Sequence, residues 1–213
     1  MNQDVAARLR REYEAEGLAV SDMSVDPFSE FEVWFSGVLA IELTEPNTFV
    51  LATATAEGVP SARAVLMKEF STEGIVFYTN LQSRKSDELR STGAAAATFV
   101  WVPLHRQVRF EGDVEPVDDA TADAYFSTRP RGAQVAAHAS KQSQVISRDE
   151  LEASFAHLSD QFGDDAIPRP GHWGGWRLVP TSVEFWQGRP NRFHDRIRYR
   201  LQGAQWVKER LSP

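Results

Sequence analysis

Alternation of apolar and polar residues constrains the fold of this chain more than any other feature. Three segments with a period of two follow one another between residues 48 and 80, and the turns between them, at 57–60 and 71–74, contain glycine. A period of two places successive side chains on opposite faces, as in a strand, and glycine supplies the backbone freedom that tight turns need. The pattern predicts a three-stranded meander.

Strand-like segments continue toward the C-terminus, and helical patterns are fewer. Further strands are expected at 94–102, 106–117, 176–180, 182–187, 192–201 and 205–211. Helices are expected at 3–16, from Asp26-Pro27 onward, and at 83–92, 118–129 and 147–163, the last with a capping box of Ser147 and Glu150. Seven or more strands with sparse helices predict a mainly β fold with flanking helices, in which a single β-barrel carries its helices outside.

The composition excludes several classes of protein. The chain has no cysteine, which rules out disulfides and thiol catalysis, and its five histidines show no metal-ligand spacing. The charged N-terminus lacks the apolar stretch of a secretory signal, and no apolar run is long enough to span a membrane, so a cytoplasmic location is expected. A net charge of −7 argues against non-specific nucleic-acid binding, so any anion site must be local.

The segment RFHDRIRYR, at 192–200, concentrates four arginines and a histidine in an acidic protein. Strand alternation would place one set of side chains on a basic face: Arg192, His194, Arg196, Arg198 and Arg200. It would place the mostly apolar set on the opposite, inward face: Phe193, Asp195, Ile197, Tyr199 and Leu201. The basic face is either a solvated edge strand, where cations deter aggregation, or a surface that binds an anion.

A second basic cluster lies where a predicted strand ends and a predicted helix begins. FYTNLQSRKSDEL places Thr79, Ser83, Arg84 and Lys85 at this point. Unpaired backbone N–H groups at a helix start, together with hydroxyls and cations, make a phosphate site, although ordinary capping by Asn80 or Ser83 fits equally well. The chain has neither a Rossmann nor a P-loop glycine motif, so side chains would have to hold any phosphate.

Two further candidates carry positive charge. Arg63 and Lys68 are five residues apart, so on a regular strand they face opposite ways and would serve different ligands or different ends of one site. Lys68 follows an apolar run, where a core-facing lysine needs a partner. Tyr125, Arg129 and Arg131 end a predicted helix, where arginine could instead satisfy the last carbonyls.

Eight segments in one order resemble the pyridoxine (pyridoxamine) 5′-phosphate oxidases over nearly the whole chain. They are RREYEAEGL, RAVLMK, FYTNLQSRKSDEL, HRQVRFEG, YFSTRPRGAQ, SKQSQVISR, WGGWRLVP and EFWQGRPNRFHDRIRY. The resemblance implies an FMN-binding split β-barrel and a homodimer with FMN at the subunit interface. It implies oxidation of pyridoxine or pyridoxamine 5′-phosphate to pyridoxal 5′-phosphate, with O2 reduced to H2O2. The resemblance also implies that residues 1–213 form one domain. Its N-terminal helical segment, 1–45, and its C-terminal strands, 175–213, would complete the dimer and the active site.

The resemblance also implies roles for individual residues. The FMN-binding set would be Arg63, Ala64, Val65, Leu66, Met67, Lys68, Tyr78, Thr79, Arg84, Lys85, Gln107, Gln142, Ser143, Trp186 and Arg196. The substrate set would be Lys68, Tyr125, Arg129 and Ala133 near the phosphate, with Arg192, Phe193 and His194 near the ring. Arg192 and His194 would be the catalytic pair. Arg10, Arg11, Glu12 and Tyr13 match a segment that closes over the substrate in this family.

The sequence departs from the family pattern at three positions, which we expect to affect substrate affinity more than flavin binding. Ala133 stands where serine is usual, His138 where tryptophan is frequent, and Phe193 where leucine is usual. Other functions stay open at this point: an FMN oxidase of the phenazine-biosynthesis type, a non-catalytic flavin- or PLP-binding protein, or an anion- or nucleic-acid-binding barrel that uses the arginine segment.

Overall fold

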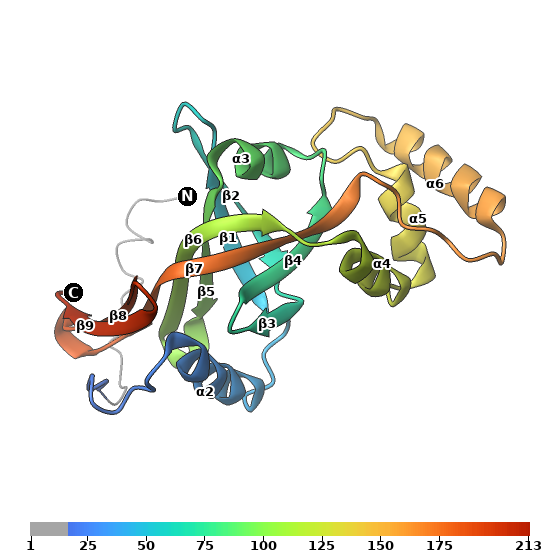
Figure 1. The fold of residues 1–213 in the computed structure, drawn as a ribbon. Helices are drawn as coiled ribbons and strands as arrows, with labels where there is room; N and C mark the ends of the chain where they lie inside the picture. The colour runs from blue at the N-terminus through green and yellow to red at the C-terminus, as the bar shows by residue number, and fades with distance from the viewer. Residues whose placement is uncertain (1–16) are drawn as a thin grey trace, which may run out of the picture. The chain divides into compact units, whose positions relative to one another are not determined.

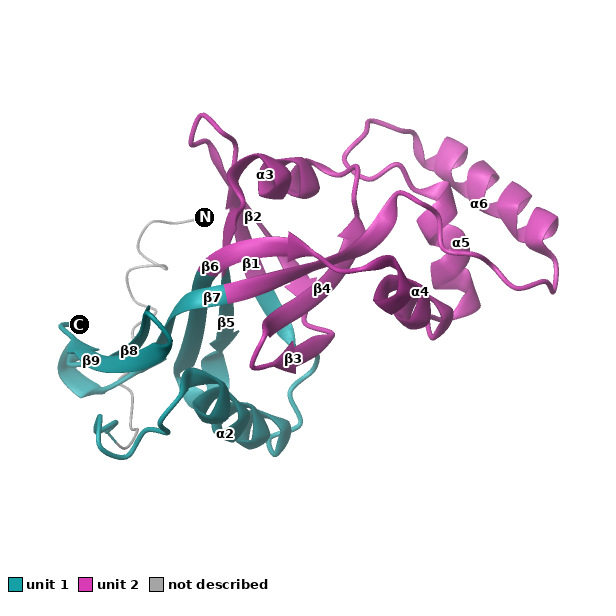
Figure 2. Cartoon of the chain, viewed as in Figure 1, with its two compact units in different colours: residues 1–49, 97–111, 180–213 teal, residues 50–96, 112–179 magenta. Residues whose placement is uncertain are grey.

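The computed structural model describes residues 17–213, which divide into two compact units (Figure 2). One unit contains the described residues up to Phe49, together with Ala97–Glu111 and Pro180–Pro213; the other contains Val50–Ala96 and Gly112–Val179. The helix expected at 3–16 and the candidate residues Arg10, Arg11, Glu12 and Tyr13 lie outside the described residues.

The described residues form one nine-stranded sheet (Figure 1). Its strands are β1 (Thr48–Ala54), β2 (Pro60–Leu66), β3 (Glu69–Ser71), β4 (Gly74–Asn80), β5 (Ala94–Trp101), β6 (Arg106–Pro116), β7 (Trp173–Gln187), β8 (Asp195–Gln202) and β9 (Gln205–Leu211). The order is β2-β1-β5-β6-β7-β4-β3, with β8 pairing with both β7 and β9. The predicted split-barrel class, mainly β with flanking helices, is confirmed by the solved structures described below.

Five α-helices and two single 3₁₀ turns accompany the strands in the described part of the chain. They are α2 (Pro27–Leu39), α3 (Arg84–Thr92), η1 (Val102–Leu104), α4 (Asp119–Ser127), α5 (Arg131–Ala139), α6 (Arg148–Phe162) and η2 (Pro190–Arg192). The Asp26 side chain accepts hydrogen bonds from the backbone of Phe28 and Ser29 at the start of α2. Ser147 and Glu150 form the predicted capping box of α6. Local capping chemistry therefore fixed both helix starts.

Aromatic side chains form the core of the first unit. The Phe31 ring of α2 lies 5.1 Å from the rings of both Phe99 and Phe110, and Trp34 lies 5.1 Å from Phe185 in an edge-to-face arrangement. All five side chains are almost fully buried. Their packing holds α2 against β5, β6 and β7, because contact of large rings supplies much of the apolar area that a small unit can bury.

The second unit has its own apolar cluster, to which α4 and α5 contribute side chains. Phe126, Val135, Ala137, Ile167 and Trp173 are buried together, and α5 lies alongside α6 (Figure 1). Strand β4 pairs with β7 in an antiparallel register that sets Tyr78 opposite a glycine of β7. That glycine has no side chain to collide with the Tyr78 ring, whose carbons would lie 2.9–3.0 Å from an added Cβ.

Several predicted elements differ from those observed. The strand expected at 61–70 breaks after Leu66 and resumes at Glu69, and the two strands expected between 176 and 187 are one strand, β7. Helix α5 lies where no helix was expected. The strand expected from Arg192 begins at Asp195, so its first three residues do not alternate as predicted, whereas Ile197 and Tyr199 are fully buried as expected of an inward face.

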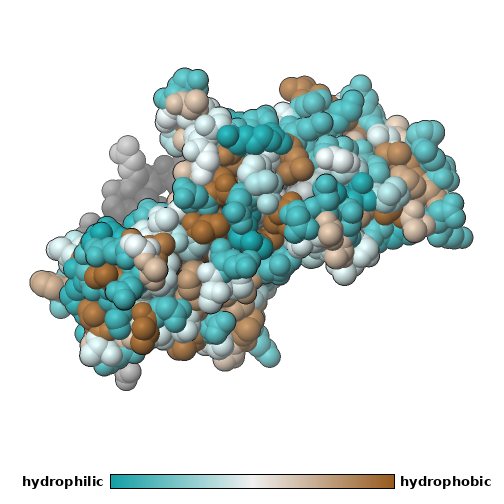
Figure 3. Space-filling model, in the orientation of Figure 1, coloured by the Kyte–Doolittle hydropathy of each residue, from teal (hydrophilic) through white to brown (hydrophobic). Residues whose placement is uncertain are grey.

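Hydrophobic residues are scattered among hydrophilic ones on the face that Figure 3 shows. Within residues 17–213, no helix combines the length and the apolar character needed to cross a membrane.

Candidate functional site

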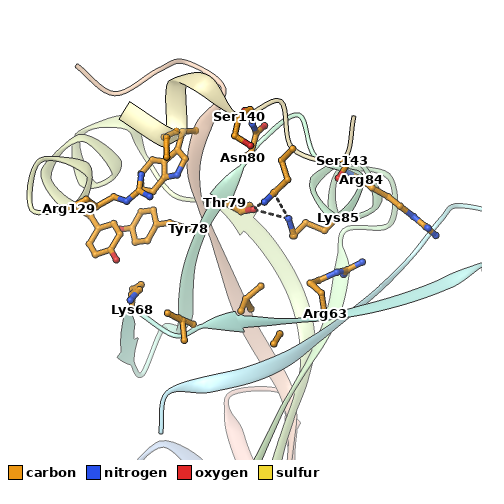
Figure 4. A pocket seen from close by; sticks show the side chains of 18 of the residues that line it. Arg63, Lys68, Tyr78, Thr79, Asn80, Arg84, Lys85, Arg129, Ser140 and Ser143 are labelled. Atoms are coloured by element: carbon orange, nitrogen blue, oxygen red, sulfur yellow. Dashed lines mark hydrogen bonds between the residues drawn. The ribbon is translucent and has the colours of Figure 1, made fainter. Parts of the chain in front are cut away.

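A cavity of about 850 Å³ opens in the second unit, and we call it the main cavity (Figure 4). Its walls come from the end of β2, the end of β4, the start of α3, the segment from α4 to α5, and the loop that follows α5. Cationic side chains line it at two ends. Figure 4 places Lys68 and Arg129 at one end and Arg63, Arg84 and Lys85 at the other, with Thr79 between them.

Lys85 lies at the α3 end of the main cavity and forms hydrogen bonds with three side chains there. Its buried ammonium donates hydrogen bonds to Thr79 Oγ1 at 3.0 Å, Ser83 Oγ at 3.2 Å and Gln142 Oε1 at 2.6 Å. Burial, and then the charge of Arg63, lower the pKa of Lys85 to about 8. A neighbouring negative charge stabilises an ammonium group. An anion bound beside Lys85 would therefore raise its pKa again and favour the protonated form.

The start of helix α3 has no side-chain cap. The Ser83 hydroxyl donates to the carbonyl of Asn80 instead of accepting from the helix, and the Asn80 side chain accepts from the backbone of Gln82. Ser143 Oγ, from the distant loop, accepts from the Arg84 backbone N–H at 3.2 Å. Capping by Asn80 or Ser83, the alternative left open by the sequence, is therefore not what these residues do. Ser143 takes up the first backbone N–H, and the positive dipole end of α3 lies beside the cavity that Arg84 and Lys85 line.

Arg129 lies at the opposite end of the main cavity. Its guanidinium lies over the rings of Trp173 and Phe126, with the Cζ carbon 4.8 and 5.4 Å from the two ring centroids. One terminal nitrogen, Nη1, is buried without a hydrogen-bond partner among the described residues. Burial lowers the pKa of Arg129. The Arg129 side chain is half-buried and lines the cavity, so its cationic guanidinium gives this end the chemistry of an anion-binding site.

Aromatic rings line the end of the main cavity that holds Arg129. Tyr78 stacks on Tyr125 with ring centroids 4.1 Å apart and on Trp173 at 5.3 Å, with interplanar angles of 15° and 5°. The Tyr78 hydroxyl donates to Glu69 at 3.0 Å. Lys68, in the break between β2 and β3, is exposed and lines the cavity, so the core-facing lysine that the apolar run suggested is not observed.

The segment from α4 to α5 is held by Gln134 and Arg131. The Gln134 side-chain amide donates to the carbonyls of Phe126, Ser127 and Arg129 at 3.1–3.2 Å. Arg131 donates to the carbonyls of Phe162 and Gly163 at the end of α6, and at 2.8 Å to that of Asp165, which follows the helix. Arginine does satisfy helix-end carbonyls here, but Arg131 does so for α6, and Arg129 stays available to the cavity.

Most FMN and phosphate candidates of the second unit line the main cavity. These are Arg63, Ala64, Val65, Leu66, Lys68, Tyr78, Thr79, Arg84, Lys85, Tyr125, Arg129, Gln142 and Ser143. Three others do not line it. Met67 is buried in the core, Ala133 lies one helical turn before the lining residue Ala136, and His138 bonds to the carbonyl of Pro168 at 2.8 Å.

The remaining candidate residues within the described part of the chain belong to the first unit. A second cavity, of about 750 Å³, is lined by residues 189–191, 193–195 and 210–213, including Phe193 and His194. Trp186 of β7 pairs with Arg196 of β8, and its ring lies 4.7 Å from that of His194. Gln107 lies half-buried on β6.

Arg196 and His194 have defined partners. Arg196 makes a two-point ion pair with the buried Glu184, at 2.7 and 3.1 Å, which raises the pKa of Arg196. The Arg189 backbone N–H donates to His194 Nδ1 at 3.1 Å. Burial and the charge of Arg192 lower the pKa of His194, so the ring is neutral at pH 7, with its proton on Nε2.

Arg192 does not lie on a strand face. It ends the turn η2, and both it and Asn191 have a positive φ, of 62° and 54°. Side chains other than glycine adopt this conformation at a cost, and it persists where the surroundings demand it. The predicted alignment of Arg192 and His194 with Arg196 along one strand is therefore wrong, because β8 begins only at Asp195.

Sequence reasoning missed several residues that build the site. Trp173 forms part of the aromatic wall, Gln134 holds the carbonyls beside Arg129, and Glu88 and Glu184 pair with candidate arginines. The i, i+4 spacing of Arg84 and Glu88 was a signal that could have indicated one of these pairs. No local pattern marks the others: Trp173 stacks on Tyr78 and Glu88 reaches Arg63 from distant parts of the chain, and the partners of Gln134 are backbone carbonyls.

Comparison with known proteins identifies the class of this fold. The structure of PhzG from Burkholderia lata, in complex with tetrahydrophenazine-1-carboxylic acid, superposes with a TM-score of 0.86 at 30% identity, covering 91% of this chain and 96% of that one. A pyridoxamine 5′-phosphate oxidase-related, FMN-binding protein from Nostoc punctiforme superposes with a TM-score of 0.69 at 19% identity, covering 90% of this chain and all of that one. The fold is that of the split-barrel class that includes FMN-binding proteins.

The sequence comparisons identify the family within that class. Residues 38–162 match the family model described as pyridoxamine 5′-phosphate oxidase, and residues 173–213 match the pyridoxine 5′-phosphate oxidase C-terminal dimerisation region. Pyridoxine/pyridoxamine 5′-phosphate oxidases from Cupriavidus necator and Cyanothece sp. are 51% and 48% identical over 209 and 206 residues, covering 97% and 96% of this chain and 98% and 97% of theirs. The chain belongs to the pyridoxine/pyridoxamine 5′-phosphate oxidase family, whose members are FMN-dependent oxidoreductases.

Proposed function

We propose that this protein binds FMN and oxidises pyridoxine or pyridoxamine 5′-phosphate to pyridoxal 5′-phosphate, with O2 reduced to H2O2. The observation that carries the proposal is the main cavity with a cationic group at each end (Figure 4). Cofactor and substrate each carry a phosphate, so a site for both must hold two anions in an otherwise acidic protein.

The residues present fit the FMN phosphate at the α3 end of the main cavity. Lys85, Arg84 and Arg63 supply positive charge, and the start of α3 supplies its helix dipole. At the other end, Lys68, Tyr125 and the Arg129 guanidinium fit the substrate phosphate. Charge-assisted hydrogen bonds of this kind are roughly twice as strong as neutral ones, which makes the two ends strong anchors for a ligand pair.

The reaction converts a carbon that bears an alcohol or an amine into an aldehyde; for the amine, water enters and ammonia leaves. FMN supplies the hydride acceptor when it is bound. The protein's part is to hold the reactive carbon close to the flavin, because near-attack geometry supplies much of the rate. We assign Arg192 and the neutral His194 to the substrate ring, and Gln107, Trp186 and Arg196 to the flavin. The donors of Arg196 and Gln107 would stabilise negative charge on the reduced ring.

We further propose that the protein acts as a homodimer with FMN at the subunit interface. The match of residues 173–213 to a dimerisation region supports this, because Trp186, Arg192, His194 and Arg196 all lie within it. The roles of Arg10, Arg11, Glu12 and Tyr13 over the substrate, and of Ala133 and Phe193 beside it, stay predictions, as does the cytoplasmic location.

A phenazine-type oxidase is the second candidate, because a structure of PhzG with tetrahydrophenazine-1-carboxylic acid superposes at 30% identity. That compound carries no phosphate. The substrate-phosphate end of the main cavity separates the two candidates, since Lys68 and Arg129 would have no charged group of this kind to bind.

The decisive experiment mixes the purified yellow protein anaerobically with pyridoxine 5′-phosphate and follows the flavin absorbance. We expect bleaching with the phosphorylated substrate, much less with pyridoxine, and formation of H2O2 and an aldehyde once air is admitted. Arg129→Ala should raise KM for the phosphorylated substrate without changing the FMN Kd. A colourless protein that cannot be reconstituted with FMN would contradict both oxidase candidates, and bleaching only by tetrahydrophenazine-1-carboxylic acid would favour the second.

A further inference from the structure

Glu88 is a buried carboxylate beside the cationic α3 end of the main cavity. Its side chain is 3% exposed and does not line the main cavity itself. It lines a smaller cavity of about 490 Å³, which shares Arg84, Gln142 and Ser143 with the main cavity. A carboxylate so close to a proposed phosphate site would repel the ligand unless its contacts to the cations outweigh that repulsion.

The contacts of Glu88 run to both arginines of the proposed phosphate site. Arg84 Nε donates to Glu88 Oε1 at 2.7 Å, one helical turn away on α3. Arg63 Nη2, from β2, lies 3.4 Å from Glu88 Oε2. The same oxygen accepts from the hydroxyls of Thr53 and Ser61, the latter at 2.6 Å.

Besides the direct contact, the hydroxyls of Thr53 and Ser61 link Glu88 to Arg63 through hydrogen bonds. Burial works to raise the pKa of Glu88, yet hydrogen bonds from Ser61, Thr53 and Arg84 bring it down to about 2, so the carboxylate is ionised and accepts only. Both hydroxyl protons therefore point at Glu88, and the hydroxyl lone pairs are left to face Arg63, whose Nη1 and Nη2 donate to Thr53 and Ser61 respectively. Arg63 Nη1 also donates to the carbonyl of Leu51 at 3.3 Å.

These contacts leave specific donors for a ligand. Among the described residues, the Nε of Arg63 and both terminal nitrogens of Arg84 have no hydrogen-bond partner. The charges also balance: Arg63, Arg84 and Lys85 against one carboxylate leave about two positive charges, which match the charge of a phosphate monoester near pH 7. The three cations repel one another, and Glu88 offsets part of that repulsion; the charge of Arg63 adds to burial, the larger cause, in lowering the pKa of Lys85.

We propose that Glu88 is a positioning residue for the phosphate end of the main cavity, holding the guanidinium groups of Arg63 and Arg84 in their binding orientation without touching the ligand. The role rests on the proposed function, in which the FMN phosphate occupies this end. It assigns Thr53 and Ser61 a part as well, because their hydroxyls transmit the orientation from Glu88 to Arg63.

The test compares the binding of FMN with that of riboflavin, which lacks the phosphate, by flavin fluorescence. We expect Glu88→Gln to weaken FMN binding about tenfold or more, because Arg84 then faces an amide and the hydroxyls lose their fixed direction, and to change riboflavin binding by less than about twofold. Asp87→Asn is the matched control: it removes the same charge at the next residue, which is exposed and pairs with Arg90 on the outer side of α3. It should change neither affinity.

Two further variants keep the test decisive if Glu88→Gln folds poorly. Ser61→Ala retains the carboxylate and removes one connecting hydroxyl, and it should weaken FMN binding several-fold while leaving riboflavin binding unchanged. In an Arg63→Ala, Arg84→Ala background, Glu88→Gln should have little further effect on FMN binding, since a positioning residue acts only through the groups that it positions.

Three binding results would contradict the positioning role of Glu88. If the wild-type protein binds FMN and Glu88→Gln binds it equally well or more tightly, Glu88 is only a repelling charge and the proposal is wrong. An equal loss of FMN and riboflavin binding would show a general structural defect and would also overturn it. A wild-type protein that does not bind FMN would instead refute the proposed function, and this role with it.

Discussion

Lys85 Nζ and Gln142 Oε1 are joined by a hydrogen bond of 2.6 Å across 57 positions of the chain. The bond ties the loop after α5 to the start of α3, and Thr79 Oγ1 donates to the same amide oxygen at 3.1 Å. Lys85 therefore belongs to a fixed network and does not extend into solvent. The first two predictions follow from this arrangement.

Replacing Arg84 and Lys85 together by alanine should weaken FMN binding by at least about tenfold. The change removes charge-assisted hydrogen bonds that contribute about 1.5–3 kcal/mol each when their geometry is good. Fluorescence titration of the ligand-free protein measures the effect. Arg90→Ala, at the exposed end of the same helix, is the control and should leave the affinity unchanged. An unaltered Kd in the double variant would show that the pair is only solvated charge.

FMN affinity should fall as the pH rises above about 8. The pKa of Lys85 is lowered to about 8 in the ligand-free protein, so at higher pH the ammonium is neutral before binding. A bound phosphate dianion favours the protonated form, so binding then takes up a proton and Kd increases by up to about tenfold per pH unit. Titrations between about pH 7 and pH 9.5 test this. In Lys85→Arg the side chain stays charged, and the rise in Kd should disappear; a rise of equal size there would assign it to another group.

Arg192→Ala should lower turnover strongly while leaving bound FMN and the thermal stability of the protein intact. Arg192 is exposed, so its removal leaves no buried cavity. Steady-state rates with pyridoxine 5′-phosphate and the flavin content of the purified variant are the two measurements. Arg200→Ala, an exposed arginine of β8, should change neither. A variant that loses FMN but turns over normally at saturating cofactor would reverse the division of roles between Arg192 and Arg196.

Ala133→Ser should lower KM for pyridoxine 5′-phosphate several-fold with little change in kcat. A serine hydroxyl one turn before Ala136 could donate to the substrate phosphate, and a bond of about 1 kcal/mol net corresponds to about fivefold in affinity. Phosphate is bound equally in the ground and transition states, so kcat should stay constant. The variant should be measured with and without His138→Trp. An unchanged KM in both would place the phosphate away from the first turns of α5.

Local sequence determined much of the fold. Alternation of apolar residues predicted β1, β4 and the inward face of β8, where Ile197 and Tyr199 are fully buried. Capping chemistry predicted the starts of α2 and α6. These features depend on neighbours a few residues away, so the information lies within a short window of sequence. Charge alone also marked Lys68, Arg84, Lys85 and Arg129, all of which line the main cavity.

Only the tertiary structure decided how the candidate residues are used. Arg192 lies in a left-handed turn because β8 can begin only where β7 offers a partner, at the pair Gln187 and Asp195. Helix α5 begins without a side-chain cap and is held by contacts that Gln134 makes to the preceding segment. Glu88 becomes an internal partner for Arg63 only when β1, β2 and α3 come together. These contacts form only once separate elements pack together, and the free energy of a buried contact depends on the partner that folding supplies, which the pattern of one element does not contain.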